Sequence, residues 1–221
     1  MAAPILFIGN KNYSSWSMRP WLALKWGGIA FEERIIPLGG EGYGKSQIRE
    51  VRAVSPSGRV PALLVGATTI HESLAICEWA AEQAPPLWPA DALARAEARA
   101  AATEMHAGFA AVRRDMSMNI RRRVARTPAW PEDTRADLER LFALWDHLLS
   151  ASGGPYLFGA RTNVDAMFAP VVTRLRTYAV ETPAFAQTYC NTILSDDAFQ
   201  EWERAAIAEP WTIEQTEALY R

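Results

Sequence analysis

Short apolar segments alternate with helical patterns along the first third of the chain. Four runs fit strands: Ile5–Ile8, Phe31–Ile36, Val60–Val65 and Thr68–Ile70. Helical spacing follows the first run from Trp16 to Trp26 and ends at Gly27, and a second helix begins at Ser73. A strand–helix–strand unit is parallel, whereas a tight turn at Gly66 makes a hairpin antiparallel. These segments therefore predict a mixed four-stranded sheet.

A proline-rich stretch, Pro85–Pro89, interrupts this pattern, and the rest of the chain has helical spacing. The predicted helices cover residues 90–111, 135–149, 162–175 and 199–207. The pattern therefore predicts a small α/β domain (residues 1–84), a linker (85–91) and an all-α domain (92–221).

Composition narrows the class of protein. The chain has 221 residues, of which 49% are hydrophobic and 22% charged, with a formal net charge of −2. This balance excludes a disordered chain and a protein that holds nucleic acid by overall charge. No run approaches the roughly 20 apolar residues of a membrane helix, and the first residues lack the charged region of a signal peptide. We expect a soluble, cytoplasmic protein with no membrane or nucleic-acid partner.

Cysteine and histidine spacing predicts no metal site. Cys77 and Cys190 are the only cysteines, which is too few for a disulfide framework or a zinc site. The three histidines, His71, His106 and His147, lack the spacing of metal ligands.

Four hydroxyl side chains gather where the first strand gives way to a helix: Tyr13, Ser14, Ser15 and Ser17. Pro20 is tolerated only in the first turn of a helix, which favours a helix cap at Ser17. Hydroxyls at such a position can donate to an anion, and the helix dipole favours the same charge. The alternative is that these serines only cap and turn the chain.

Two further motifs suit an extended, carboxylate-bearing ligand. Proline cannot donate to a sheet ladder, so a strand that begins at Pro61 leaves the backbone of Val60 free to pair with the ligand. Glu72 and Ser73 stand at a predicted helix N-terminus, where N–H groups and a hydroxyl suit a carboxylate. The alternative is an ordinary turn proline and a capping pair.

These motifs together resemble the glutathione S-transferase superfamily, and Ser14–Leu24 resembles its zeta-type serine pattern. The Val60-Pro61 step, the Glu72-Ser73 pair, the proline-rich linker and a helix-capping box at Thr162–Ala166 occur in the same order. The resemblance implies a thioredoxin-like first domain with a cis peptide bond at Pro61, followed by an all-α domain. It also implies glutathione as co-substrate, no metal, a pocket for a hydrophobic electrophile beside the helical domain, and a homodimer.

The resemblance also assigns roles to residues. Ser14 falls on the family's active serine with Ser15 and Ser17 beside it, and Tyr13 is the alternative because other classes use a tyrosine there. The glutathione-binding set is Lys45, Arg59, Val60, Pro61, Glu72 and Ser73. The second-substrate set is Met105, His106, Phe109, Val112, Arg113 and Met116, although such spacing is also typical of a helix core.

The function implied is detoxification by a glutathione transferase that activates the glutathione thiolate for conjugation, isomerisation or peroxide reduction. Trp16 stands where zeta proteins carry a cysteine, which argues against a zeta-like maleylacetoacetate isomerase activity and against chemistry that uses an enzyme thiol. The alternative function is a non-catalytic ligand-binding or stress protein with the same fold.

Two other patterns suggest different ligands. Gly39–Ser46 matches a phosphate-binding loop, but no strand ends in the acidic residue that such a site needs for Mg²⁺. A basic cluster follows residue 112: Arg113, Arg114, Arg121, Arg122, Arg123 and Arg126. It lacks interleaved aromatic residues, so we interpret it as a solvated helix end and loop.

Overall fold

The first part of the chain forms the mixed four-stranded sheet that the alternating pattern predicts. The computed structural model describes residues 3–218, so the expectations for residues 1–2 and 219–221 lie outside it. The strands are β1 (Ile5–Ile8), β2 (Glu32–Ile35), β3 (Ala62–Val65) and β4 (Thr68–His71). Their order is β2-β1-β3-β4; β1 and β2 are parallel, and the other two pairs are antiparallel.

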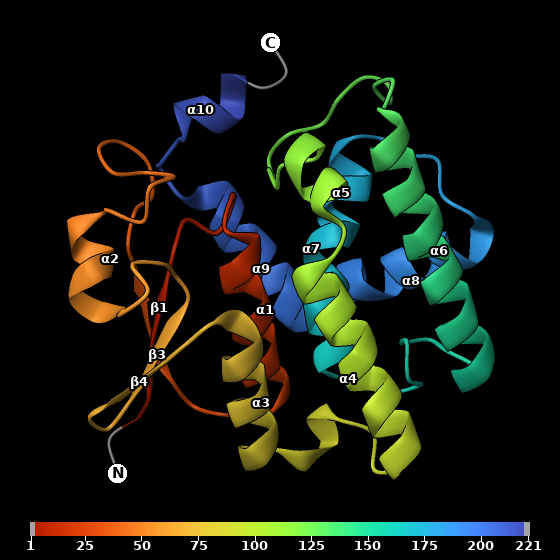
Figure 1. Cartoon of the computed structure of the whole chain (residues 1–221), viewed down its shortest axis with the longest axis horizontal. Coiled ribbons are helices and arrows are strands. Elements are labelled where there is room, and N and C mark those ends of the chain that lie inside the picture. The colour runs from red at the N-terminus through yellow and green to blue at the C-terminus, as the bar shows by residue number, and fades with distance from the viewer. Residues whose placement is uncertain (1–2, 219–221) are drawn as a thin grey trace.

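Helices α1 (Ser15–Trp26) and α3 (Ser73–Gln83) lie on one side of the sheet, and α2 (Arg49–Val54) lies on the other (Figure 1). Helix α1 contacts α3 and also α7 (Asn163–Thr177) and α9 (Asp197–Ala208). Because it is covered on several sides, α1 is buried along most of its length. The peptide bond between Val60 and Pro61 is cis, as the resemblance implies. The thioredoxin-like fold of this part is confirmed.

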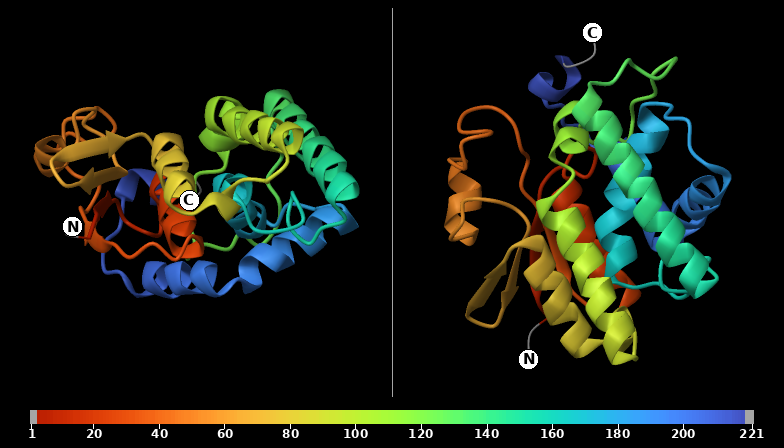
Figure 2. Two further views of the ribbon diagram at one scale, coloured as in Figure 1. Left: turned by 90° about the horizontal axis from the view of Figure 1, so that it is seen from below. Right: turned by 45° about the vertical axis from the view of Figure 1, so that its right-hand side comes forward.

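The rest of the chain is helical, beginning with a 3-10 helix at Pro85–Leu87 in the proline-rich stretch. The other helices are α4 (Ala92–Ala107), α5 (Ala110–Asp115), α6 (Glu132–Ser152), α8 (Ala184–Ser195) and α10 (Glu214–Glu217). Nearly every residue of α7 is buried, because it contacts α1, α4 and α8. Helices α8 and α9 run beneath both parts of the molecule (Figure 2, left). The all-α second part is therefore also confirmed.

The predicted capping box begins α7. Asp165 accepts hydrogen bonds from the Thr162 N–H (2.9 Å), the Leu157 N–H (3.1 Å) and the Tyr189 hydroxyl (3.2 Å). Burial nevertheless raises the pKa of Asp165 to about 6, because the charged form has lost its water.

The start of α1 differs from the prediction. The helix begins at Ser15 with Ser14 as its cap, so Pro20 lies inside the helix and the predicted cap at Ser17 is wrong. The first-turn rule for proline reflects the cost of one lost backbone hydrogen bond and a local clash. Packing of the buried helix on both parts of the molecule outweighs that cost.

The predicted helix 90–111 is two helices. Helix α4 ends at Ala107, Gly108 follows, and Phe109 has a positive φ of 53° before α5 begins. A side chain at Gly108 would place its Cβ 2.8 Å from the Glu104 carbonyl oxygen, so only glycine fits this turn. Helices α2, α8 and α10 were not predicted; α2 has six residues and α10 has four, which is too short to show hydrophobic periodicity.

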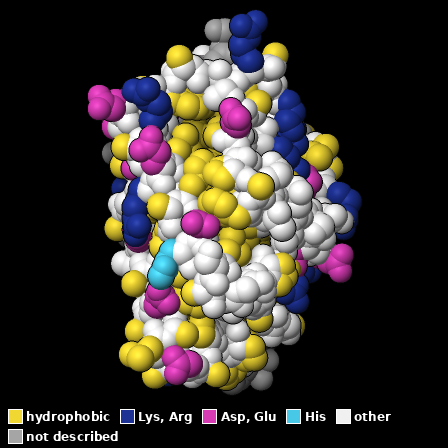
Figure 3. Space-filling model, turned by 90° about the vertical axis from the view of Figure 1, so that its right-hand side faces the viewer, with side chains coloured by type: hydrophobic (Ala, Val, Ile, Leu, Met, Phe, Trp, Pro, Cys, Tyr) yellow, Lys and Arg dark blue, Asp and Glu magenta, His cyan; other side chains and the backbone are white. Residues whose placement is uncertain are grey.

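The surface of the helical part mixes charged and apolar side chains. On the face that it turns away from the sheet, hydrophobic side chains gather in a central band with charged ones on either side (Figure 3). Within residues 3–218, no helix is long and apolar enough to cross a membrane.

Candidate active site

The predicted hydroxyl cluster lines a cavity at the N-terminus of α1. Tyr13, Ser14, Ser15 and Trp16 form one wall of this cavity, which has a volume of about 320 Å³. The cavity is also lined by Gly58, Arg59 and Val60 and by Gly42, Tyr43, Gly44 and Ser46 of the glycine-rich loop. The structure therefore brings the two main sequence motifs, more than forty residues apart, to one site.

A short hydrogen-bond chain holds the serines in place. The Ser14 hydroxyl donates to Ser17 Oγ at 2.7 Å, and Ser17 Oγ also accepts the Gly9 N–H at 3.2 Å. Ser17 is fully buried, whereas Ser14 and Ser15 each keep 6% of their surface exposed. Ser17 therefore supports Ser14 from behind, and Ser14 and Ser15 face the cavity.

A second cavity of about 500 Å³ adjoins the first. Its lining includes Pro61, His71, Glu72 and His106, and it shares Trp16, Ser46, Arg59 and Val60 with the serine cavity. The Val60 backbone lies outside the β3 ladder, whose register begins at Ala62. The predicted residues Arg59, Val60, Pro61 and Glu72 thus lie along one continuous depression that starts at Ser14.

Glu72 stands at the junction of β4 and α3. It caps α3 with a positive φ of 94°, and its side chain is 47% exposed. The hydroxyl of the buried Ser73 donates to Glu72 Oε1 at 3.3 Å, and His106 Nε2 lies 2.9 Å from Glu72 Oε2. Lys45, by contrast, is exposed and lines neither cavity.

Tyr13 is committed to another contact. Its hydroxyl donates to Glu217 at 2.6 Å and accepts from Arg121 at 3.1 Å. Burial and the neighbouring Glu217 carboxylate both raise the pKa of Tyr13. A hydroxyl that already donates to a carboxylate is poorly placed to donate to a ligand anion, so the geometry favours the serines.

The predicted second-substrate wall is mostly core. Met105, Phe109, Val112 and Met116 are buried in the hydrophobic cluster that joins the two parts. Arg113 donates to the backbone carbonyls of Met105 and Gly108 and lies 5.8 Å from the Trp16 ring. Only His106 of this set lines either of the two cavities, because helix spacing alone does not distinguish a core face from a cavity face.

A buried arginine to which the resemblance assigns no role, Arg19, lies next to this site. The Arg19 guanidinium is 4.3 Å from the Trp16 ring centre and fully buried, and none of its nitrogens has a hydrogen-bond partner. Burial lowers the pKa of Arg19 to about 9, and the nearby Arg174 and Arg113 act in the same direction. Its place in the Ser14–Leu24 segment, which resembles the zeta-type serine pattern, was the available signal in the sequence.

The basic cluster lies at the end of α5 and in the loop that follows, as predicted, and Arg114, Arg121, Arg123 and Arg126 are exposed there. Arg121 donates to the carbonyls of Glu209 and Trp211, and Arg114 pairs with Asp115 and Asp133. Arg114 and Arg121 thus also connect segments that are distant in the sequence. The glycine-rich loop lines part of the serine cavity and precedes the short α2. The sheet beside it is mixed, with one parallel and two antiparallel strand pairs.

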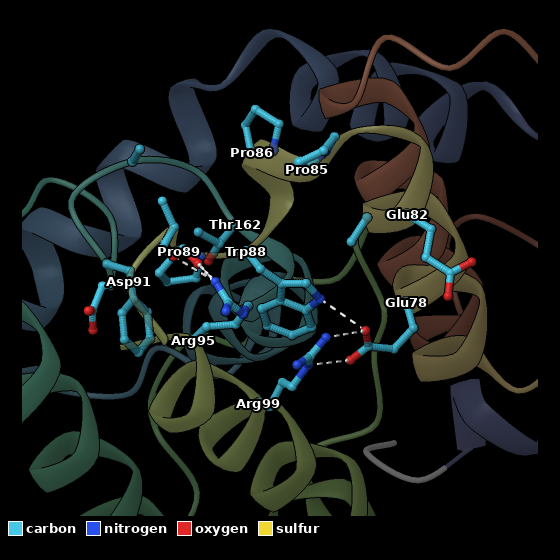
Figure 4. Close-up of a pocket in the computed structure, with 14 residues that line it drawn as sticks. Glu78, Glu82, Pro85, Pro86, Trp88, Pro89, Asp91, Arg95, Arg99 and Thr162 are labelled. Carbon is cyan, nitrogen blue, oxygen red and sulfur yellow. Dashed lines mark hydrogen bonds and ion pairs between the residues drawn. The ribbon is translucent and has the colours of Figure 1, made fainter. Parts of the chain in front are cut away.

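A wider cavity of about 850 Å³ lies between the end of α3, the proline-rich stretch and the start of α4 (Figure 4). Three of its side chains are bonded to one another: Glu78 accepts hydrogen bonds from Arg99 at 3.2 Å and from the Trp88 indole at 3.1 Å. None of the four predicted hydroxyls lines it. The candidate active site is therefore the serine cavity.

Neither a metal cluster nor a reactive thiol marks the site. The described residues contain no group of three or more His, Cys, Asp or Glu side chains that could hold a metal ion. Both cysteines are buried, and burial raises the pKa of the Cys77 thiol and that of Cys190 to about 12.

Comparison with known proteins agrees with this geometry. The family model of the glutathione S-transferase N-terminal domain matches residues 13–83, which contain the serines, Pro61 and Glu72. The chain belongs to the glutathione S-transferase superfamily. A probable maleylacetoacetate isomerase of Caenorhabditis elegans is 37% identical over 99 residues, which is 44% of each chain. A maleylacetoacetate isomerase of Rattus norvegicus is 29% identical over 207 residues, which is 89% of this chain and 90% of the rat protein.

Solved glutathione S-transferase structures share the whole fold. A glutathione transferase homologue from Burkholderia with bound glutathione has a TM-score of 0.72 and 24% identity, covering 94% of this chain and 100% of that one. Maleyl pyruvate isomerase, described as a bacterial zeta-class glutathione S-transferase, has a TM-score of 0.69 and 26% identity, covering 93% and 98%. The named activities of these relatives support the expectation of a glutathione transferase-family enzyme.

Proposed function

We propose that this glutathione S-transferase superfamily member binds glutathione along the depression from Ser14 to Glu72 and activates its thiol for attack on a small electrophile. The observation that carries the proposal is that Ser14 and Ser15 share one cavity with Val60, the residue before cis-Pro61. If the backbone of the cysteinyl residue of glutathione pairs with the Val60 backbone, its thiol would lie beside hydroxyls at a helix N-terminus.

The other predicted contacts suit the two ends of glutathione. The Glu72 carboxylate would accept from the α-ammonium group, and Ser73 supports that carboxylate from below. Arg59 stands at the edge of both cavities, where it donates to Ser46 at 3.1 Å, and it would attract a carboxylate of glutathione. Lys45 would act at longer range from its exposed position.

The serine cluster can supply enough free energy to ionise the thiol. A free thiol has a pKa of about 8.5 and is mostly protonated at neutral pH. Lowering this pKa by ~2 units requires ~2.7 kcal/mol of preferential stabilisation of the thiolate. One charge-assisted hydroxyl bond supplies about 1.5–3 kcal/mol, and a helix N-terminus adds about 0.3–1 kcal/mol. Ser14 would remain neutral: its hydroxyl would turn from Ser17 to donate to the thiolate, and Ser17 would in turn donate to Ser14 Oγ.

Isomerisation is the second candidate, and the arginines favour it. Among the described residues, Arg19, Arg113 and Arg174 form no ion pair with a carboxylate, and their positive charges lie near one another. Unneutralised positive charge favours an electrophile that carries a carboxylate, as the substrates named for the relatives do. The thiolate would add to a carbon–carbon double bond of the substrate, which leaves a single bond that can rotate. Departure of the thiolate would then restore the double bond in the other configuration.

Calorimetry and rate measurements together test these proposals. The unaltered protein should bind glutathione. Glu72→Ala should weaken the binding of glutathione but not the binding of N-acetylglutathione, which lacks the free amino group. Rates with an aryl halide, a hydroperoxide and maleylpyruvate should identify the reaction. Binding without turnover of any of the three would favour the non-catalytic alternative. Absence of glutathione binding would overturn the proposal.

A further inference from the structure

A histidine from the helical domain reaches into the glutathione-binding side of the site. His106 lies in the last turn of α4 and is 27% exposed, and its Nε2 is 2.9 Å from Glu72 Oε2. Both residues line the cavity of about 500 Å³ that continues from the serines. A carboxylate only accepts hydrogen bonds, so the shared proton is on Nε2 of the imidazole.

The imidazole ring is itself held in place. It packs against the edge of the Trp16 ring, with 5.3 Å between the ring centres. Its Nδ1 is buried without a hydrogen-bond partner, so Glu72 is the group that orients the ring. Trp16 in turn lies between His106, Arg19 and Arg113.

The two ends of the Glu72 carboxylate are thereby held by different domains. Ser73, in the first domain, donates to Oε1 at 3.3 Å, and His106, in the helical domain, binds Oε2 at 2.9 Å. Without His106, this half-exposed glutamate would be free to sample several rotamers. Each oxygen keeps a second lone pair that can accept a proton from a ligand.

We propose that His106 is a positioning residue for glutathione: it holds the Glu72 carboxylate toward the cavity so that the carboxylate can receive the α-ammonium group. This inference rests on the proposed binding of glutathione at Glu72. It adds that the helical domain, through one side chain, sets the affinity of the first domain for its ligand. Losing an ordered glutamate rotamer corresponds to about three- to tenfold in affinity.

Three variants at position 106 separate this role from a structural one. Calorimetry would measure the binding of glutathione and of γ-glutaryl-cysteinyl-glycine, which is glutathione without the α-amino group. His106→Ala should lower the affinity for glutathione about three- to tenfold and leave the affinity for the glutaryl compound unchanged. His106→Gln places an amide N–H near the position of Nε2 and should restore binding, whereas His106→Asn places it near Nδ1 and should behave as His106→Ala.

A double variant and a kinetic readout complete the test. In the Glu72→Ala background, His106→Ala should cause no further loss of affinity, because the two residues act as one unit. At saturating glutathione, kcat should be unchanged while KM for glutathione rises. The role of His106 would be overturned if His106→Ala weakened the binding of both ligands equally or made glutathione bind more tightly. It would also be overturned if His106→Ala still lowered glutathione affinity in the Glu72→Ala background. If the unaltered protein binds neither compound, the proposed function itself fails.

Discussion

At the scale of single residues, Ser14 carries the proposed chemistry, and its replacement separates activation from binding. Ser14→Ala should leave glutathione affinity nearly intact, because the backbone of Val60 and the Glu72 carboxylate hold the ligand elsewhere. It should raise the kinetic pKa of the bound thiol by about 1–2 units, which corresponds to a charge-assisted bond of about 1.5–3 kcal/mol. The pH dependence of kcat/KM measures this shift.

Tyr13→Phe is the matched control for that experiment. The Tyr13 hydroxyl donates to Glu217 rather than into the cavity, so its loss should barely change the thiol pKa. If Tyr13→Phe raises the pKa and Ser14→Ala does not, the tyrosine is the thiolate donor and the assignment is wrong.

At the scale of elements, the capping box of α7 predicts a pH-dependent stability. The folded protein holds the Asp165 proton more tightly than the unfolded chain, because burial raises its pKa to about 6. The stabilisation that protonated Asp165 adds to the free energy of unfolding is therefore fully present below about pH 4 and is lost as the pH rises through 6. The difference in unfolding free energy between Asp165→Asn and the unaltered protein should shift by about 2–3 kcal/mol in favour of the variant from pH 4 to pH 7.

Asp91→Asn is the control for Asp165→Asn. Asp91 caps α4 from an exposed position, and backbone N–H groups lower the pKa of its carboxyl group. Its contribution changes only below about pH 4, so this variant should show a constant difference between pH 4 and pH 7. Denaturant titrations at each pH measure both, and a constant difference for Asp165→Asn as well would contradict the prediction.

A second element-scale contact ties the end of α9 to the loop before the serines. The Glu209 carboxylate accepts the Lys11 N–H at 2.7 Å and the Asn12 N–H at 2.9 Å. Glu209→Ala should lower the free energy of unfolding by about 1–3 kcal/mol, because it leaves buried N–H groups unpaired. Glu201→Ala breaks only the exposed ion pair with Lys25 and should cost less than about 1 kcal/mol. Equal effects in urea titrations would contradict this reasoning.

At the scale of the whole molecule, we propose that two chains form a homodimer, with the first domain of one subunit against the helical domain of the other. The family resemblance motivates this prediction, and the band of hydrophobic side chains in Figure 3 is compatible with a buried interface. Light scattering should therefore give twice the chain mass of 24.6 kDa at micromolar concentration. A mass equal to that of one chain would rule out the dimer.

The sequence by itself determined what depends on neighbouring residues. Alternating apolar runs indicated β1 and β3, the Thr162–Asp165 pattern indicated the start of α7, and the hydroxyl cluster indicated a site at the N-terminus of α1. Each of these signals depends on residues only a few positions apart in the sequence, where periodicity and capping chemistry decide the local structure. The order of the motifs was enough to recognise the family.

Only the tertiary structure decided which side chains meet. Met105 and Phe109 belong to the core while their neighbour His106 reaches Glu72, 34 positions earlier in the chain. Pro20 lies inside α1, and Arg19 beside it is buried without a partner, because both parts of the molecule pack around that helix. Local patterns report which residues avoid water, but the choice of partner follows from packing between elements distant in sequence, where contact geometry outweighs local preference.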